Sequence, residues 1–400
     1  MPWKELCTMG AREQFVLRAM EPGCNFSALC REYGVSRKTG YKWVKRYEQR
    51  GLAGLEDASR RPHTSSLQVD ADVAMHVVSI RTKHSNWGAR KIVEVLRNEG
   101  VEDVPSERTV HRILVRAGLL QPGHRPRKRT KSNGPSRPPR AAADKPNDLW
   151  TVDFKGWWLG TDRRRVEPLT VRDARTRYVF AVHIVRKPSY DEVRPVFEEL
   201  FKTYGLPKAI LSDNGPPFVS NQGKLGLTKL SAWWATLGIE HHRSRVGKPQ
   251  DNGGHERMHK DIADELEVLG EALSPMQYQE AAERWRHDFN CHRPHEALGM
   301  RRPADVYRRS DVTYSGLPAS HVYPDGFVVK PVNKRGAVFF HRRICFISNA
   351  VAGMEVGLEP IGELRYDVWL AERKLGWIDC GAQANKIHPY MWDEVSPKCA

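Results

Sequence analysis

The chain has 400 residues, of which 40% are hydrophobic, so it can build more than one buried core. Its 64 Lys and Arg exceed its 48 Asp and Glu, and the formal net charge of +16 points to an anionic partner such as nucleic acid. The sequence lacks the run of about 20 apolar residues that a membrane helix needs. It also lacks an apolar signal segment, so we expect a cytoplasmic protein with no membrane partner. Seven scattered cysteines argue against a disulfide framework, and the histidines show no zinc-finger spacing.

Residues 11–50 are predicted to form three short helices that include a helix-turn-helix. Gly34 suits the strained backbone of the turn, and Ser36 can cap the helix that follows. Tyr41 and Val44 have the spacing of core residues on that helix. Its basic residues fall largely at other positions, as expected for a helix that enters the major groove of DNA; the candidate contacts are Arg37, Lys38, Lys42, Lys45 and Arg46. A helical hairpin with a solvated charged face is the alternative.

Residues 68–120 repeat this theme after a first domain that we place at 1–62. Trp87 precedes an amphipathic helix, and Ser106 precedes another over 107–116. The second of these carries basic residues four apart on one face, so Arg108 and Arg112 are further candidate DNA contacts. The pattern indicates a second helix-turn-helix, of either the plain or the winged form. Two such modules suit a long, asymmetric DNA site.

A basic, proline-rich segment follows and separates the helical part from a mixed α/β part. Residues 121–140 contain seven Lys or Arg, five Pro and no acid, so they cannot bury a core. We place this linker at 121–147 and the α/β domain at 148–310.

The α/β domain begins with a strand that carries an aspartate. Trp150, Val152 and Phe154 alternate, which puts Asp153 on the opposite face. Strands over 166–172 and 178–185 and a helix over 190–204 come next.

Two further acids stand at comparable places. Asp213 follows a short buried strand over 209–211, although Asp-Asn-Gly is also ordinary turn chemistry. Glu256 lies on a helix that runs to Leu266, with Asn252 and Lys260 on the same face. Taken alone, Glu256 could be a solvated helix residue.

Together, two aspartates at strand ends and a glutamate on a later helix can converge at one edge of a sheet. Three such acids repel one another unless a hard cation lies between them, and Mg²⁺ suits carboxylate oxygens. Two ions about 4 Å apart can hold the attacking and leaving oxygens of a phosphoryl displacement. The sequence therefore predicts a metal-dependent phosphoryl-transfer site.

These segments resemble the DDE integrase-like transposases of bacterial insertion sequences. The resemblance rests on Trp-Thr-Val-Asp-Phe around Asp153, Ser-Asp-Asn-Gly-Pro-Pro-Phe around Asp213, and Lys-Pro-Gln-Asp-Asn-Gly-Gly-His-Glu-Arg around Glu256. A fourth block, Phe-Asn-Cys-His-Arg-Pro-His-Glu-Ala-Leu, begins at Phe289. The resemblance implies a ribonuclease-H-like core, in which Asp153, Asp213 and Glu256 bind two Mg²⁺ ions that Mn²⁺ can replace. DNA contacts are expected at Lys248, Asn252 and Lys260.

Residues 320–385 alternate short apolar runs with turns, which predicts five strands and a small β-barrel. The whole is expected to be a multidomain transposase, with all-α helix-turn-helix modules, an α/β catalytic core and this barrel. It would recognise element ends in double-stranded DNA, nick them, and join the 3′ hydroxyls to target DNA as a homo-oligomer in the bacterial nucleoid. The alternatives are a nuclease of the same fold that does not join, and an inactive DNA-binding regulator.

Overall fold

The structure is a computed structural model of the chain. It describes residues 8–57, 69–120, 143–160, 163–220, 223, 225–245, 253–266, 273–316, 321–381 and 386–390. The chain divides into two compact units, residues 1–70 and residues 71–400. Residues 121–142 of the predicted linker 121–147 and the candidate contacts Lys248 and Asn252 lie outside the described residues. Among the helices that are described, none combines the length and the apolar character needed to cross a membrane.

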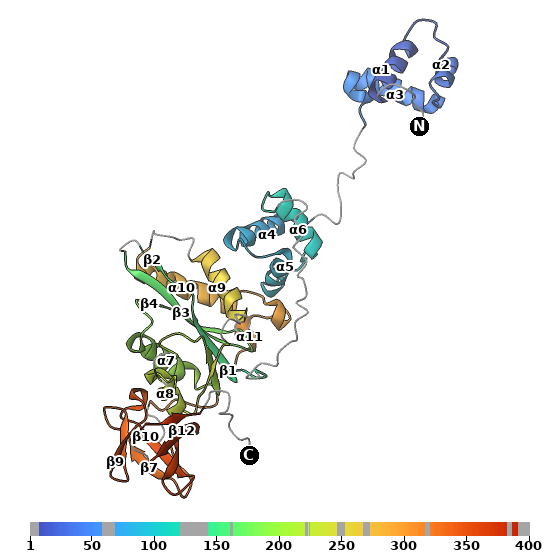
Figure 1. Cartoon of the computed structure of the whole chain (residues 1–400). Coiled ribbons are helices and arrows are strands. Elements are labelled where there is room, and N and C mark those ends of the chain that lie inside the picture. The colour runs from blue at the N-terminus through green and yellow to red at the C-terminus, as the bar shows by residue number, and fades with distance from the viewer. Residues whose placement is uncertain are drawn as a thin grey trace. The chain divides into compact units, whose positions relative to one another are not determined.

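The first unit contains three helices and a short 3-10 turn, as predicted for this segment (Figure 1): α1 (Thr8–Ala19), α2 (Phe26–Glu32), α3 (Arg37–Arg50) and η1 (Gly51–Leu55). Gly34 adopts a left-handed φ of 63°, which confirms its place in the turn. The Ser36 hydroxyl accepts a hydrogen bond from the Thr39 amide at 3.1 Å and caps α3. Phe15, Trp43 and Leu55 form the centre of a small apolar core.

The predicted core position of Tyr41 is wrong. Its side chain is 53% exposed and stacks on the ring of Phe26, with centroids 4.2 Å apart. The buried face of α3 instead carries Gly40 and Trp43. A Cβ atom on Gly40 would lie 2.8 Å from the ring of Phe15, so the absent side chain lets the helices approach closely.

The second unit begins with another group of three helices: α4 (Ala71–Lys83), α5 (Ala89–Asn98) and α6 (Glu107–Arg116). Ser106 caps α6 by accepting a hydrogen bond from the Thr109 amide at 3.3 Å. Within the described residues 69–120 there is no strand, so the wing considered from the sequence is not found. The group contacts the α/β part, where the Asn86 amide donates to the Glu265 carboxylate at 3.2 Å.

The α/β part is built on a mixed six-stranded sheet in the order β2-β3-β1-β5-β6, with β4 also paired to β3. Strands β1, β3 and β4 pair antiparallel, whereas β1, β5 and β6 pair parallel. The strands are β1 (Leu149–Phe154), β2 (Trp158–Leu159), β3 (Arg165–Asp173), β4 (Val179–Val185), β5 (Ala209–Ser212) and β6 (Glu240–Arg243). The predicted α/β core with a mixed sheet is confirmed.

Helices cover both faces of this sheet (Figure 1): α7 (Tyr190–Tyr204), α8 (Lys229–Thr236), α9 (Gly253–Glu265), α10 (Pro275–Cys291), η4 (Glu296–Leu298) and α11 (Pro303–Val306). Phe197 of α7 and Trp234 of α8 share one core with Trp150 and Val152 of β1. On the other face, α9 and α10 pack together over Val182 of β4. Because side chains alternate along a strand, Thr151 and Asp153 point toward the α9 face.

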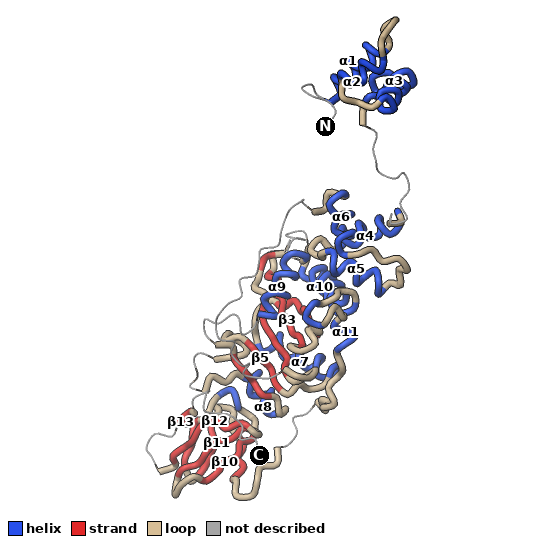
Figure 2. Tube along the Cα trace, turned by 90° about the vertical axis from the view of Figure 1, so that its right-hand side faces the viewer, coloured by secondary structure: helices blue, strands red, loops and turns tan. Residues whose placement is uncertain are grey.

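The C-terminal strands form a five-stranded sheet in the order β13-β12-β11-β10-β7 and a separate β8-β9 pair. They are β7 (Val328–Pro331), β8 (Ala337–Phe340), β9 (Arg343–Phe346), β10 (Glu355–Pro360), β11 (Arg365–Leu370), β12 (Arg373–Asp379) and β13 (His388–Pro389), with η5 at Asn349–Val351. Among the described residues the sheets do not close, so the predicted barrel is not confirmed. Ala232 and Ala235 of α8 belong to the apolar core of this region. Figure 2 shows α8 between the central sheet and the C-terminal strands.

Candidate active site

Strand register places two of the three predicted carboxylates level with each other. In the parallel pair β1 and β5, Thr151 lies opposite Leu211. Two residues further along, both strands reach an aspartate, Asp153 on β1 and Asp213 directly after β5. Because parallel strands end at the same edge of a sheet, both acids lie at that edge.

The charges of both other acids act on the pKa of Asp153. Burial, and next the charges of Asp213 and then Glu256, raise the pKa of Asp153 to about 7. The Phe154 amide donates a hydrogen bond to Asp153 Oδ1 at 2.9 Å, which acts in the opposite direction. The structure therefore places Asp213 and Glu256 within electrostatic range of Asp153.

One oxygen of Asp213 has no partner among the residues that the structure describes. This Oδ1 atom is buried and accepts no hydrogen bond from them, although the Gly215 amide donates to the carboxylate. Burial raises the pKa of Asp213. A buried carboxylate oxygen without a donor is costly. A bound cation would satisfy it, so this atom fits a metal ligand.

Glu256 is exposed in the first turn of α9, and the residues around it fix that helix. The Arg172 guanidinium of β3 donates to the Gly254 carbonyl at 2.7 Å. A Cβ atom on Gly254 would lie 2.1 Å from Arg172 Nη2, so only glycine allows this contact. The start of α9 is thereby held against the strand next to β1.

Two histidines of α9, one before and one after Glu256, also attach this helix to the sheet. Thr170 Oγ1 donates to the Asp153 carbonyl at 2.9 Å and lies 3.0 Å from His255 Nε2 and 2.8 Å from His259 Nε2. A hydroxyl has one proton, so Thr170 accepts from both rings, and each histidine carries its proton on Nε2. His255 Nδ1 then accepts from the Thr151 hydroxyl at 2.8 Å.

This arrangement places a neutral histidine of α9 beside Asp153. His259 Nδ1 lies 4.0 Å from Asp153 Oδ2, and in this tautomer it presents a lone pair. Burial, with the charges of Lys155 and Arg172, lowers the pKa of His259 to about 4, so the ring is neutral at neutral pH. His255 and His259 were not predicted as site residues. Their signal in the sequence is the four-residue spacing on either side of Glu256, which puts them on one helix face.

The three carboxylates do not form a single tight cluster. Among the described residues, the one group of three His, Cys, Asp or Glu whose ligand atoms all lie within 4.8 Å of one another is His287, Asp288 and His292. The ligand atoms of the three catalytic candidates are therefore not all within 4.8 Å of one another.

The predicted DNA contacts that the structure describes lie on accessible helix faces. On α3 the basic residues are exposed except Arg46, which is half-buried with its guanidinium 5.2 Å from the Trp43 ring centroid. Arg108 and Arg112 of α6 and Lys260 of α9 are exposed as well. Their contacts with DNA remain predictions.

Family models match along most of the described chain. A model described as an integrase core domain matches residues 143–249, and a second integrase core model matches residues 237–303. A helix-turn-helix model matches residues 11–63, and a homeodomain-like model matches residues 39–114.

Proteins of insertion elements are similar to this chain over most of their length. The 39.2 kDa protein of insertion element IS476 from Xanthomonas euvesicatoria is 30% identical over 258 residues, which is 63% of this chain and 69% of the relative. The chain belongs to the integrase-core transposases of bacterial insertion elements. The 31.7 kDa protein of IS407 from Burkholderia multivorans is 27% identical over 60% of this chain and 82% of its own length.

Integrase-core membership places the α/β part in the ribonuclease-H-like DDE polynucleotidyl transferase superfamily, whose cores bind divalent metals. The activity class is thus integrase-like DNA recombination. Viral sequences are also similar: the Pol polyprotein of feline endogenous virus ECE1 is 32% identical over 32% of this chain and 12% of its own. The catalytic core domain of HTLV-2 integrase, solved with magnesium, is 17% identical over 41% of this chain and 98% of that chain, with a TM-score of 0.32.

Proposed function

We propose that the protein nicks the ends of its insertion element and joins the 3′ hydroxyls to target DNA, and that Asp153, Asp213 and Glu256 form the catalytic site. The observation that carries the proposal is the position of Asp153, which lies at the same sheet edge as Asp213 and within the electrostatic field of Glu256. Burial, and next the charges of these two acids, raises the pKa of Asp153 to about 7, and a carboxyl perturbed in this way is typical of functional sites.

The proposed cofactor is a pair of Mg²⁺ ions, with Mn²⁺ as a substitute. The unpartnered Asp213 Oδ1 atom and the all-oxygen donor set support a hard cation. When bound, such ions activate the attacking hydroxyl or water and offset the charge that develops on the leaving 3′ oxygen. Asp153, Asp213 and Glu256 would hold these ions.

The surrounding residues hold these ligands in place. Thr170 donates to the backbone of Asp153 and accepts from two histidines of α9, so one hydroxyl connects β1, β3 and the helix that carries Glu256. Arg172 fixes the first turn of that helix. Positions set by buried hydrogen bonds are retained through a reaction, and phosphoryl transfer depends chiefly on positioning and electrostatics.

Recognition of the element ends is assigned to the two helical modules, through the basic faces of α3 and α6. Both modules begin these helices with a serine cap, at Ser36 and Ser106, and leave the basic side chains accessible. The substrate is double-stranded chromosomal DNA, and a homo-oligomer assembled on two ends in the nucleoid is the form in which we expect joining to occur.

The test is a joining assay with labelled element ends, plasmid target and Mg²⁺. Asp153→Asn, Asp213→Asn and Glu256→Gln should each lower both nicking and joining at least about 100-fold, since one site serves both steps. Binding to the ends should persist. The matched control is Asp264→Asn, which removes an exposed carboxylate from α9 and should leave both steps near wild type.

Two results would overturn parts of this proposal. Near wild-type joining by Asp213→Asn would return Asp213 to an ordinary turn residue. Metal-dependent nicking without any joined product, from the wild-type chain on its own ends, would favour the non-joining nuclease.

A further inference from the structure

A second cluster of metal-ligand side chains lies at the C-terminal end of α10, apart from the three carboxylates. His287 and Asp288 occupy the last turn of the helix, and His292 is its C-cap residue. The His292 amide donates to the Asp288 carbonyl at 3.0 Å, which continues the helical turn by one residue. The His292 ring consequently returns over that turn, with its centroid 5.3 Å from the ring of His287.

The spacing of these side chains is that of a metal site. His292 Nδ1 lies 3.2 Å from Asp288 Oδ1, and a ligand atom of His287 lies within 4.8 Å of both. Tetrahedral sites have bonds of about 2.0–2.1 Å to nitrogen or oxygen, so neighbouring ligand atoms stand roughly 3.3–3.4 Å apart. His287 is exposed and can close the remaining gap by rotating its side chain.

Two other pairs show why the third ligand matters. His76 and Glu99 approach to 3.1 Å, and so do His242 and Glu240. Neither belongs to a group of three within the part of the chain that the structure describes, so each is an ion pair at most. At the end of α10, the pair of His292 and Asp288 has the imidazole of His287 as a third candidate ligand.

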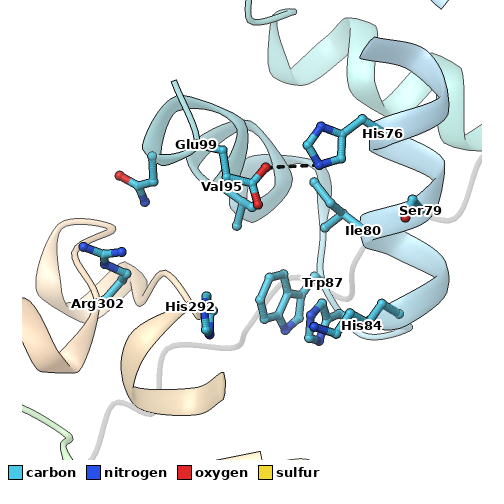
Figure 3. A pocket seen from close by; sticks show the side chains of 11 residues that line it. His76, Ser79, Ile80, His84, Trp87, Val95, Glu99, His292 and Arg302 are labelled. Atoms are coloured by element: carbon cyan, nitrogen blue, oxygen red, sulfur yellow. Dashed lines mark ion pairs between the residues drawn. The ribbon is translucent and has the colours of Figure 1, made fainter. Parts of the chain in front are cut away.

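The surroundings leave one side of the cluster open. Lys83 Nζ of α4 lies 3.8 Å from Asp288 Oδ2, so it contacts the oxygen that does not face His292. His292 also lines a pocket together with His84 and Trp87 (Figure 3). A metal held by three protein ligands would therefore have a fourth position available for water.

We propose that His287, Asp288 and His292 bind one divalent transition-metal ion of the zinc class. Two imidazoles and a carboxylate select Zn²⁺, Co²⁺ or Ni²⁺ over Mg²⁺, which prefers oxygen ligands. The ion would fix the turn directly before Arg293, whose guanidinium binds Asp261 of α9 at 2.7 Å, and would do so beside α4. Its role is to stabilise this junction, and the inference does not depend on the proposed joining chemistry.

The experiment is calorimetric titration of the tag-free, full-length Asp153→Asn/Asp213→Asn/Glu256→Gln protein with ZnCl₂ in millimolar Mg²⁺, which keeps the carboxylate site from contributing. One Zn²⁺ per chain should bind. His287→Ala, His292→Ala and Asp288→Asn, each added to this background, should weaken binding at least about 10-fold. His76→Ala, which alters the His–Glu pair in the same pocket, should change nothing (Figure 3).

Co²⁺ provides a second readout, since tetrahedral coordination gives it an intense visible absorption that the His287→Ala protein should lose. His287 is exposed, so this variant should fold normally. Zn²⁺ affinity unchanged by His287→Ala and His292→Ala, or no stoichiometric binding at all, would overturn the proposal.

Discussion

The two faces of the central sheet differ in the kind of contact that covers them. On the face covered by α7 and α8, the buried contacts are mostly apolar and largely aromatic, and Trp234 stands at their centre with no exposed surface. Two buried polar pairs, Ser212 with His241 and Trp150 with Asn147, also lie on this face. On the face covered by α9 and α10, apolar packing over β4 is combined with buried polar pairs. Thr170 with two histidines, Arg172 with the Gly254 carbonyl, and Arg293 with Asp261 all lie there.

The difference indicates that one face chiefly stabilises the sheet and the other chiefly positions α9. Apolar packing is non-directional, so it stabilises the sheet without fixing one residue against another to a few tenths of an ångström. Hydrogen bonds and ion pairs are directional, and buried ones hold a single geometry. The polar pairs that attach α9 lie on the face where Glu256 must be placed relative to Asp153 and Asp213.

The largest loss of stability is expected on the apolar face. Trp234→Ala removes a fully buried ring and should lower the free energy of unfolding by about 3–5 kcal/mol, measured by urea denaturation. Trp157→Ala removes an indole that is 57% exposed and should cost less than about 1 kcal/mol. Equal losses in the two variants would contradict the distinction between core and surface on which the comparison rests.

The ion pair between Arg293 and Asp261 tests the polar face. Both side chains are nearly buried, at 5% and 7% exposure, so Arg293→Ala should cost about 3 kcal/mol by leaving a buried charge. The double variant Arg293→Met/Asp261→Leu removes both charges and should recover most of that stability. If the pair positions α9, joining should stay low in the double variant. Full recovery of joining would show that the pair serves stability alone.

Gly254→Ala is expected to have a smaller effect on stability and tests the contact at the start of α9. The new methyl group would meet the Arg172 guanidinium, and the helix must shift, at a cost of about 1–3 kcal/mol and with a clear loss of joining. Gly253→Ala is the matched control, because a Cβ atom there meets nothing within 4 Å. The prediction fails if the two alanine variants join DNA at the same rate.

The smallest expected effect concerns pH. Since the folded protein holds a proton on Asp153 up to about pH 7, and an unfolded Asp releases it near pH 4, the metal-free protein should lose stability as pH rises from about 4 to about 7. Asp153→Asn removes this contribution and should raise the Tm in EDTA at pH 8 by a few degrees, about 3 °C. Thermal melts at pH 4.5 and pH 8 measure it. The same pH dependence in both proteins would count against the raised pKa.

Many local features were predictable because short-range physics decides them. The helix over 190–204 and the strands around Asp153 follow from apolar periodicity, and Ser36 and Ser106 cap helices as their residue types predict. Tyr41 was misplaced because periodicity alone does not show that the missing side chain of Gly40 turns that face of α3 inward. Helices α8 and α10 and strands β6 and β10 were not predicted.

The sequence by itself determined which acids to consider and which strand or helix carries each, since those follow from spacing within a few residues. Only the tertiary structure decided that β1 and β5 lie side by side with Thr151 opposite Leu211, which makes Asp153 and Asp213 level. It alone also joined Thr170 to His255 and His259. The physical reason is that strand register and contacts between distant segments depend on the packing of the whole sheet, which no window of neighbouring residues contains.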